Sequence, residues 1–361
     1  MIQQIEYANR RRRAGARLPE WKLESLLITG LANIRYLTGF TGSNGLVLLT
    51  PEAATLYTDP RYTIQAGEET DCGVKIVAKG SLVAAAAHQI SRAKLKRIGF
   101  EKNRLSYSGY SELQQFLKLG ETLEPVASPI EQQRMIKSEA EIELIRRSVL
   151  TNSKAFDQAI RKIKPSTTES KLAAELEYQM RRFGAEKPAF ETIVAAGART
   201  ALPHAQPKPV AIGDRLLLVD MGAMQDGYCS DMTRMLHVGQ PHGRARKLFR
   251  AVLEAQLAAV DVVRANVTAG SVDGAARKVL KAHGLDKAFV HSTGHGLGLE
   301  IHEPPRLGRS DNTVLRAGMV ITIEPGAYLE GLGGVRIEDT VLVTSRGCEV
   351  LTSTEKILFI V

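Results

Sequence analysis

The sequence predicts an α/β domain followed by an α+β domain, with the boundary near residue 130. A chain of 361 residues is long for a single hydrophobic core and sufficient for two. In its first part, strand-like runs such as Leu46–Thr50 alternate with helix-like segments around 84–93 and 110–119. Near Pro125 this pattern stops, and a charged run with helical spacing begins. We therefore expect one domain over residues 1–130 and a second over residues 131–361.

The second domain is expected to combine long helices with apolar strands. One helix-like run extends from 130 to 163 before Pro165, another ends at Gly184, and a third covers 244–264. Short runs rich in Val, Ile and Leu lie between and after these helices. Helices and strands in this order are typical of an α+β domain.

Composition indicates a soluble globular protein. Hydrophobic residues make up 44% of the chain and charged residues 24%, which is ordinary for a globular domain. No apolar run approaches the roughly 20 residues of a membrane helix, and no hydrophobic signal segment follows the charged N-terminal stretch. The three cysteines fit neither a disulfide framework nor a zinc finger. We expect a cytoplasmic protein that does not bind membranes.

The positive charge of the chain could suit an acidic partner. The net charge is +9 and the isoelectric point is near 9.4, but the basic residues are scattered and no aromatic residues alternate with them. The run Arg10–Arg13 is interpreted as a solvated helix face. The sequence therefore predicts no nucleic-acid binding.

Two acidic residues flank a predicted β-hairpin. If its loop spans Met224–Gly227, Asp220 and Asp231 become direct cross-strand partners, with Cβ atoms about 4.5–5.5 Å apart. Like charges so close repel each other, and the apolar run before Asp220 removes hydration as well. A divalent cation would remove both penalties. Two exposed carboxylates at a hairpin edge are the alternative.

Three histidines lie in the segment HSTGHGLGLEIHE. They are His291, His295 and His302, and glycines on both sides of His295 permit a close backbone approach. A single histidine is more often structural, but three within twelve residues favour a functional site.

Two glutamates lie in apolar, β-branched runs. Glu324 and Glu338 would be unfavourable there unless a cation or a partner balanced their charge. For Glu324 the alternative is an exposed strand end before Pro325. For Glu338 it is an ion pair with Arg336, which strand alternation places on the same face.

Four carboxylates and one imidazole form a ligand set that suits two divalent ions such as Mn²⁺, Co²⁺ or Zn²⁺. Two such ions about 3.5–4 Å apart share a water molecule, lower its pKa and polarise a carbonyl group. The chemistry that this set predicts is hydrolysis.

In this order, the segments resemble the pita-bread metallopeptidases, in the branch of aminopeptidase P and prolidase. The resemblance runs through AFETIVAAGARTALPHA, VDMGAMQDGYCSDMTR, HSTGHGLGLEIHE, ITIEPG and GGVRIED, and through NIRYLTGFTGSNG and TDPRY nearer the N-terminus. It implies an α/β N-terminal domain of the creatinase/prolidase type and an α+β pita-bread catalytic domain. It also implies two divalent metal ions, with Mn most favoured, and a homodimer.

The resemblance assigns the metal ligands residue by residue. Asp220 would bind one metal, and Asp231 and Glu338 would bridge both. His295 and Glu324 would complete the shell of the other metal, and Glu324 would also transfer a proton.

Further residues match positions that contact the substrate in this family. His204 and His302 would steady the substrate and the tetrahedral intermediate, and His291 matches a third histidine of the site. Arg306 matches an arginine that meets a free substrate carboxylate in some prolidases, and Arg336 is a second candidate for substrate binding. Cys229 is not expected to be a nucleophile, although alternation puts it on the face of Asp231.

The resemblance implies an Xaa-Pro aminopeptidase acting on Xaa-Pro peptides, with an Xaa-Pro dipeptidase as the close alternative. A binding protein on the same fold is the remote alternative, since some relatives keep the fold and lose the metals. All five ligand positions are filled in this chain, which favours an enzyme.

Overall fold

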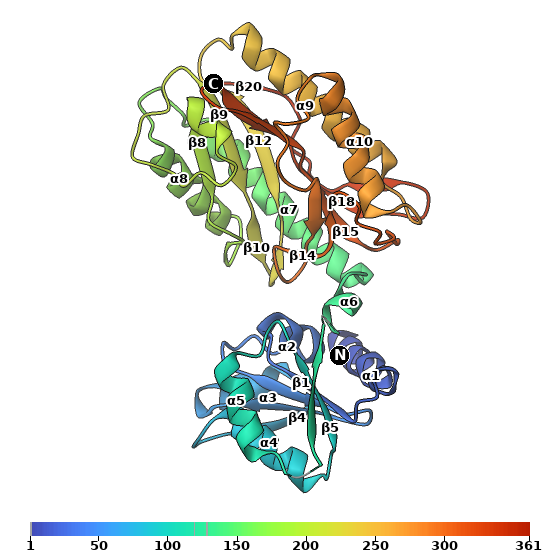
Figure 1. Cartoon of the computed structure of the whole chain (residues 1–361). Coiled ribbons are helices and arrows are strands. Elements are labelled where there is room, and N and C mark those ends of the chain that lie inside the picture. The colour runs from blue at the N-terminus through green and yellow to red at the C-terminus, as the bar shows by residue number, and fades with distance from the viewer. Residues whose placement is uncertain (1, 119, 128) are drawn as a thin grey trace. The chain divides into compact units, whose positions relative to one another are not determined.

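The computed structural model describes residues 2–118, 120–127 and 129–361. It divides the chain after Arg134 into two compact units, each with its own hydrophobic core (Figure 1). The division falls a few residues after position 130 because the short helix α6 (Glu131–Arg134) belongs to the first unit. There, buried Arg134 donates to the side-chain oxygen of Asn33 over 2.6 Å.

The N-terminal unit contains a six-stranded mixed sheet in the order β4-β3-β2-β1-β5-β6. Its strands are β1 (Ser25–Ile28), β2 (Leu46–Leu49), β3 (Ala54–Thr58), β4 (Gly73–Ile76), β5 (Arg97–Glu101) and β6 (Thr122–Val126). Its helices are α1 (Ile2–Ala16), α2 (Leu31–Thr38), α3 (Thr63–Glu69), α4 (Leu82–Arg92) and α5 (Tyr107–Phe116). The helices predicted around 84–93 and 110–119 correspond to α4 and α5. This is the predicted α/β domain.

The basic run near the N-terminus lies in α1, but only part of it faces solvent. Arg12 and Arg13 are exposed, whereas Arg10 is buried. The Arg10 guanidinium donates to the carbonyl of Tyr36 over 3.1 Å, forms an ion pair with Glu6 and lies over the Tyr36 ring. The interpretation as a solvated face is wrong for Arg10, because α2 supplies both a carbonyl and an aromatic ring to this cation.

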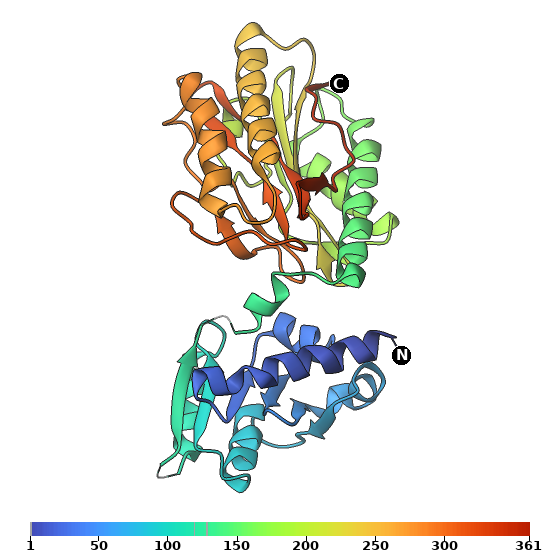
Figure 2. The same ribbon diagram turned by 90° about the vertical axis from the view of Figure 1, so that its right-hand side faces the viewer.

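The second unit contains two sheets, each packed against a pair of helices (Figures 1 and 2). The helices are α7 (Glu139–Ile160), α8 (Glu169–Arg182), α9 (Gly243–Val262) and α10 (Ala269–Ala282). One sheet has the order β20-β12-β9-β8, from Phe359–Ile360, Met232–His237, Leu216–Met221 and Ile193–Ala196. The other has the order β14-β13-β15-β18-β19, from Glu303–Leu307, Gly294–Gly296, Val320–Ile323, Asp339–Val343 and Cys348–Val350. This is the predicted α+β domain.

Two small sheets complete the second unit. One joins β11 (Tyr228–Cys229), β10 (Ala223–Gln225) and β7 (Lys187–Pro188), and the other pairs β16 (Gly326–Leu329) with β17 (Gly333–Arg336).

The helical run predicted over 130–163 is not one helix. It breaks between α6 and α7, because Ser138 begins α7 with a capping box. The Ser138 hydroxyl accepts from the backbone N–H of Glu141, and the Glu141 carboxylate accepts from the backbone N–H of Ser138. Just before this cap, Lys137 forms a buried ion pair with Glu303 over 3.3 Å.

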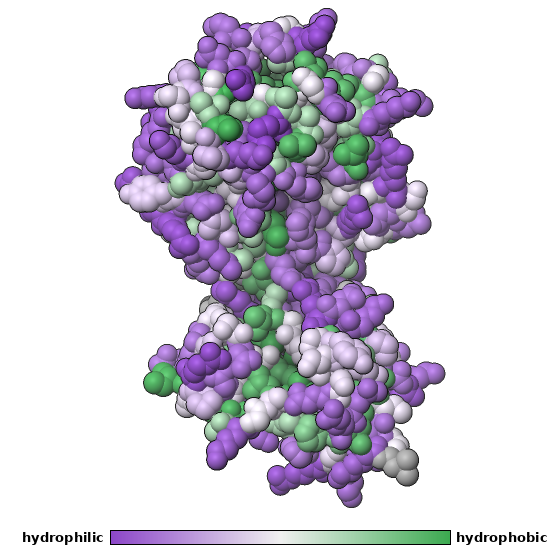
Figure 3. Space-filling view, turned by 60° about the vertical axis from the view of Figure 1, so that its left-hand side comes forward, coloured by the Kyte–Doolittle hydropathy of each residue, from purple (hydrophilic) through white to green (hydrophobic). Residues whose placement is uncertain are grey.

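The surface agrees with a globular chain. None of the described helices is long and apolar enough to cross a lipid bilayer. On the face drawn in Figure 3, hydrophilic residues cover most of the surface and hydrophobic residues form smaller groups among them.

Candidate metal centre

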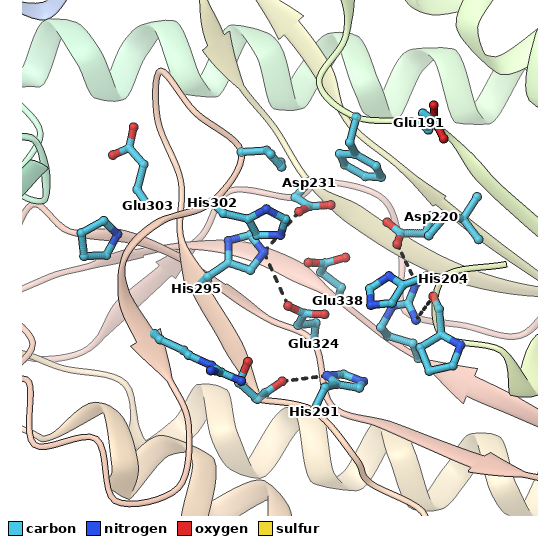
Figure 4. A pocket seen from close by; sticks show the side chains of 18 of the residues that line it. Glu191, His204, Asp220, Asp231, His291, His295, His302, Glu303, Glu324 and Glu338 are labelled. Atoms are coloured by element: carbon cyan, nitrogen blue, oxygen red, sulfur yellow. Dashed lines mark hydrogen bonds and ion pairs between the residues drawn. The ribbon is translucent and has the colours of Figure 1, made fainter. Parts of the chain in front are cut away.

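A cavity of about 710 Å³ in the second unit gathers the predicted site residues (Figure 4). All ten of them line it, namely His204, Asp220, Asp231, His291, His295, His302, Arg306, Glu324, Arg336 and Glu338. They come from the ends of the two large sheets and from the loops beside them. Residues that are more than 130 positions apart in the sequence, such as His204 and Glu338, therefore share one site.

Asp220 and Asp231 are not direct cross-strand partners as predicted. Asp220 near the end of β9 pairs with Thr233 of β12. The hairpin turns through two residues, Asp226 and Gly227, with φ of 52° and 80°, and two-residue turns with positive φ at both positions are common in hairpins. This turn is centred one residue later along the chain than the predicted four-residue loop, so each cross-strand partner shifts by two positions. Asp231 thus becomes a diagonal neighbour of Asp220, and both still face the cavity.

His295 lies in β13, where the flanking glycines are required by crowding. A Cβ atom on Gly294 would lie 1.9 Å from the carbonyl oxygen of Thr322, and one on Gly296 would lie 2.3 Å from that of Pro304. The predicted close backbone approach is confirmed. The absence of side chains on these glycines lets β13 lie between β14 and β15. The imidazole of His295 points into the site (Figure 4).

Glu338 is held by two residues of β12 that sequence reasoning missed. Thr233 donates its hydroxyl to a carboxylate oxygen of Glu338 over 2.8 Å. Arg234 donates to the main-chain carbonyl of Glu338 and forms a fully buried ion pair with Asp339 over 2.7 Å. Arg234 and Asp339 flank recognised positions in DMTR and RIED, but nothing in the sequence indicates that they meet.

The ligand atoms lie at distances that suit a metal ion. Asp231, His295 and Glu338 each offer one atom, and these three atoms all lie within 4.8 Å of one another. The Nε2 atom of His295 is 3.6 Å from Asp231 and 3.5 Å from Glu324. One carboxylate oxygen of Asp220 and one of Asp231 are buried without a hydrogen bond to any described residue. Buried oxygens left without a donor fit a cation, so the residues fit divalent metal ions.

Electrostatics supports the same conclusion. Burial raises the pKa of Asp231 and of Glu338 well above their usual values, and the neighbouring carboxylates raise both further. Burial also raises the pKa of Glu324 to about 7. For His295, burial lowers the pKa to about 4, so the imidazole is neutral at pH 7 and offers a lone pair. A divalent cation favours the ionised form of every carboxylate here.

Arg336 forms an ion pair with Asp220 over 2.6 Å and none with Glu338 among the described residues. Its guanidinium also donates to Thr233 and to the hydroxyl of Tyr328, over 3.1 and 2.8 Å. Only 3% of Arg336 is exposed. Because its N–H groups are directed at the protein, this geometry favours a positioning role over the predicted substrate-binding role.

Three histidines lie around the carboxylates. His204 and His302 are exposed, and the His302 ring is 4.4 Å from that of His295. His291 is half-buried, its Nε2 atom lies 2.8 Å from the hydroxyl of Tyr328, and burial lowers its pKa to about 4. Sequence reasoning missed Tyr328, which links His291 to Arg336. Its position in a strand carries no signal of this link.

Arg306 lies directly opposite His295 in the β13–β14 ladder. Its side chain is exposed, lines the cavity and has no hydrogen bond or ion pair with a described residue. The Arg306 guanidinium is therefore open to solvent and to a ligand in the cavity.

Cys229 is buried beside the site but is not among the described residues that line the cavity. Burial, together with the nearby carboxylate of Glu303, raises the pKa of the Cys229 thiol well above its ordinary value. A buried, protonated thiol is a poor nucleophile, in agreement with the prediction that Cys229 does not attack the substrate.

A buried group of carboxylates with one neutral imidazole, open to a cavity at the ends of two sheets, defines a divalent-metal hydrolase. Comparison with known proteins gives the family. Residues 143–345 match metallopeptidase family M24, and residues 10–136 match the creatinase/prolidase N-terminal domain. The chain belongs to metallopeptidase family M24. It has the pita-bread fold of that family and is a metallopeptidase that requires divalent metal ions.

Individual relatives match over nearly the whole chain. An Xaa-Pro dipeptidase of Pyrococcus horikoshii is 41% identical over 92% of this chain and 94% of its own length. Among solved structures, an Xaa-Pro dipeptidase from Bacillus anthracis superposes with a TM-score of 0.95, 36% identity and coverage of 98% of this chain and 100% of that one. An X-Pro aminopeptidase from Thermotoga maritima superposes with a TM-score of 0.89, 35% identity and coverage of 97% and 100%.

The raised pKa values predict how the metal-free protein responds to pH. Above pH 6.5, Glu324 and its neighbours still hold protons in the folded protein that the unfolded chain has released, so the free energy of unfolding should fall as the pH rises from 6.5 to 8. His291 and His295 have lowered pKa values, so they make the free energy of unfolding rise with pH. They do so only below about pH 6.5, where the unfolded chain takes up protons. The slope should reach at most about 1.4 kcal/mol per pH unit for each proton.

Urea unfolding followed by circular dichroism, after chelation of metals, measures this slope. Metal-loaded protein is the control and should show a flatter profile, because the bound cations keep the carboxylates ionised. A metal-free protein that gains stability over this pH range would contradict the electrostatic description.

Proposed function

We propose that the chain hydrolyses the peptide bond between an N-terminal residue and proline, as an Xaa-Pro aminopeptidase with two metal ions. The observation that carries this proposal is the buried group of Asp231, His295 and Glu338 in a cavity that also holds unpaired polar side chains. The names of the relatives support the choice of proline-containing substrates.

In this proposal, Asp220 would hold one metal ion, His295 and Glu324 would hold the second, and Asp231 and Glu338 would be shared between them. The nearly equal distances of His295 from Asp231 and Glu324 support a shared ligand sphere on that side. The oxygen-rich set with a single imidazole suits Mn²⁺, and also Co²⁺ or Zn²⁺. Two bound ions would supply a water molecule of lowered pKa and polarise the scissile carbonyl group.

The remaining chemistry belongs to side chains of the chain itself. Glu324 lines the cavity 3.5 Å from His295 and is suited to accept a proton from the attacking water and to deliver it to the leaving proline nitrogen. His302 and His204 lie exposed in the cavity, where they can donate hydrogen bonds to the substrate carbonyl. His291 lines the same cavity, and its Nε2 atom lies 2.8 Å from the hydroxyl of Tyr328.

An Xaa-Pro dipeptidase is the second candidate function, and Arg306 favours it. An exposed guanidinium without a partner, directly across from His295, is placed to meet the carboxylate of a proline at the C-terminus of a dipeptide. The two activities share the reacting bond and differ only in whether the proline carries a free carboxylate or a further residue.

The proposal includes a cytoplasmic homodimer. All three cysteines are free, and two of them are at least partly accessible, which suits a reducing compartment. Light scattering on the purified protein tests the dimer directly.

Activity on defined peptides tests the proposed function. The Mn²⁺-loaded protein should cleave Ala-Pro and Ala-Pro-Ala and should leave Ala-Ala and acetyl-Ala-Pro-Ala intact. Amino-acid analysis of the products measures this. Equal turnover of Ala-Ala would remove the preference for proline, and no turnover of any of these peptides would overturn the proposal.

Asp231→Asn should lose the metal-bridging charge. Loss of even an outer partner of a metal ligand reduces activity by roughly 10–100-fold, so we expect a loss of at least about a hundredfold in kcat together with a lower metal content. Mass spectrometry of the bound metals and kinetics on Ala-Pro give the two readouts. Asp286→Asn removes the same charge at an exposed position outside the cavity and should change neither. Unchanged turnover and metal content in Asp231→Asn would contradict the bridging role.

Arg306→Ala should weaken cleavage of dipeptides more than that of longer peptides. A charge-assisted hydrogen bond contributes about 1.5–3 kcal/mol, which corresponds to roughly a ten- to hundredfold loss in kcat/KM on Ala-Pro. Ala-Pro-Ala should be affected much less, since its proline carries no free carboxylate. The matched control is Arg309→Ala, which removes an exposed guanidinium nearby that does not line the cavity. Equal losses on both peptides, or none, would exclude Arg306 from recognition of the carboxylate.

A further inference from the structure

The charged residues of the cavity fall into two groups. One group forms ion pairs inside the protein or belongs to the proposed metal centre. Arg336 pairs with Asp220, and Glu303 pairs with Lys137. The remaining carboxylates lie around His295. The other group consists of Glu191 and Arg306. Both are exposed, both line the cavity, and neither forms a hydrogen bond or an ion pair with any residue in the described parts of the chain.

These two residues lie at opposite ends of the site. Glu191 precedes β8 by two positions, and Ile193 at the start of β8 pairs with Asp220. Arg306 pairs instead with His295, in the other sheet. Figure 4 shows Glu191 beyond Asp220, on the side away from His295, with Asp231 and Glu338 between those two ligands. The cavity therefore has a free negative charge at one end and a free positive charge at the other.

A peptide with a free N-terminus has a matching distribution of charge. Its α-ammonium group lies on the N-terminal side of the scissile bond, and any group attached after proline lies on the other side. If the scissile carbonyl lies at the metal centre and the proline side faces Arg306, the ammonium group points towards the Asp220 end. Asp220 itself is already engaged by Arg336, whereas the carboxylate of Glu191 is available.

We propose that Glu191 binds the α-ammonium group of the N-terminal residue of the substrate. This inference rests on the proposed Xaa-Pro activity and assigns a specificity-determining residue to it. The site would select peptides with an unblocked N-terminus, because a neutral N-acyl group leaves Glu191 without a cation. Phe190 and Ile193, which line the cavity on either side of Glu191, add an apolar surface for the first side chain of the peptide.

Glu191 and Arg306 should differ in the substrates that they affect. Every Xaa-Pro substrate carries the α-ammonium group, so Glu191 acts on dipeptides and on longer peptides alike. A free carboxylate directly on proline is present only in dipeptides. The two residues can therefore be separated by comparing the same pair of peptides.

Kinetics of Glu191→Gln test this inference. The amide keeps the size of the side chain and removes its charge, so KM for both Ala-Pro and Ala-Pro-Ala should rise about three- to tenfold while kcat changes little, as expected when an exposed charge contact is lost equally from the ground and transition states. The inhibition constant of propanoyl-proline, which has the shape of Ala-Pro without the ammonium group, should remain unchanged. Glu330→Gln, an exposed glutamate that does not line the cavity, is the matched control and should leave all three values unchanged.

The outcomes separate this inference from the proposed function. If the unmodified protein cleaves Xaa-Pro peptides but Glu191→Gln keeps the original KM values, Glu191 does not bind the ammonium group and only this inference is overturned. An equal weakening of Ala-Pro and of propanoyl-proline would also overturn it, since the effect would not depend on the ammonium charge. If the unmodified protein cleaves no Xaa-Pro peptide, the proposed function itself fails.

Discussion

Mutual repulsion among buried carboxylates is the constraint on which the site depends. Asp231, Glu324 and Glu338 lie together where burial and neighbouring negative charge raise the pKa of each one. Without cations such a group is stabilised by protonation, and with divalent cations it is stabilised by ionisation. The same group therefore destabilises the metal-free protein near neutral pH and, in the proposed assignment, would hold the metal ions.

The protein balances part of this charge with its own buried cations, Arg336 and Arg234. Arg336 holds Asp220 from one side, and Arg234 holds the main chain of Glu338 while its own charge is met by Asp339. Removing one partner of such a buried pair is strongly destabilising, because the remaining charge stays buried and uncompensated. These pairs fix the direction of the carboxylates around the cavity.

Sequence patterns singled out residues that line one cavity, because an acidic residue in an apolar strand or a histidine between glycines is locally unusual. Register was harder to predict. The cross-strand partner of Asp220 is Thr233 and not the predicted Asp231, because the Asp226–Gly227 turn sets the register. A single sequence leaves the conformation of such a turn open. Partnerships between distant segments, such as Tyr328 with His291 or Lys137 with Glu303, left no local signal. Arg10 shows the same limit, since burial of one arginine in a basic run depends on α2.

The arrangement of charge also separates two tasks within one cavity. The proposed metal ligands lie in strands or next to strand ends, where the sheet ladders fix their positions and buried partners fix their direction. Glu191 and Arg306 lie exposed at the two ends of the cavity, without partners among the described residues. A change at either end would alter which peptides bind while the buried metal centre stays intact. In a fold of this kind, substrate preference can therefore vary among relatives that keep the same ligands, as the names dipeptidase and aminopeptidase among similar structures illustrate.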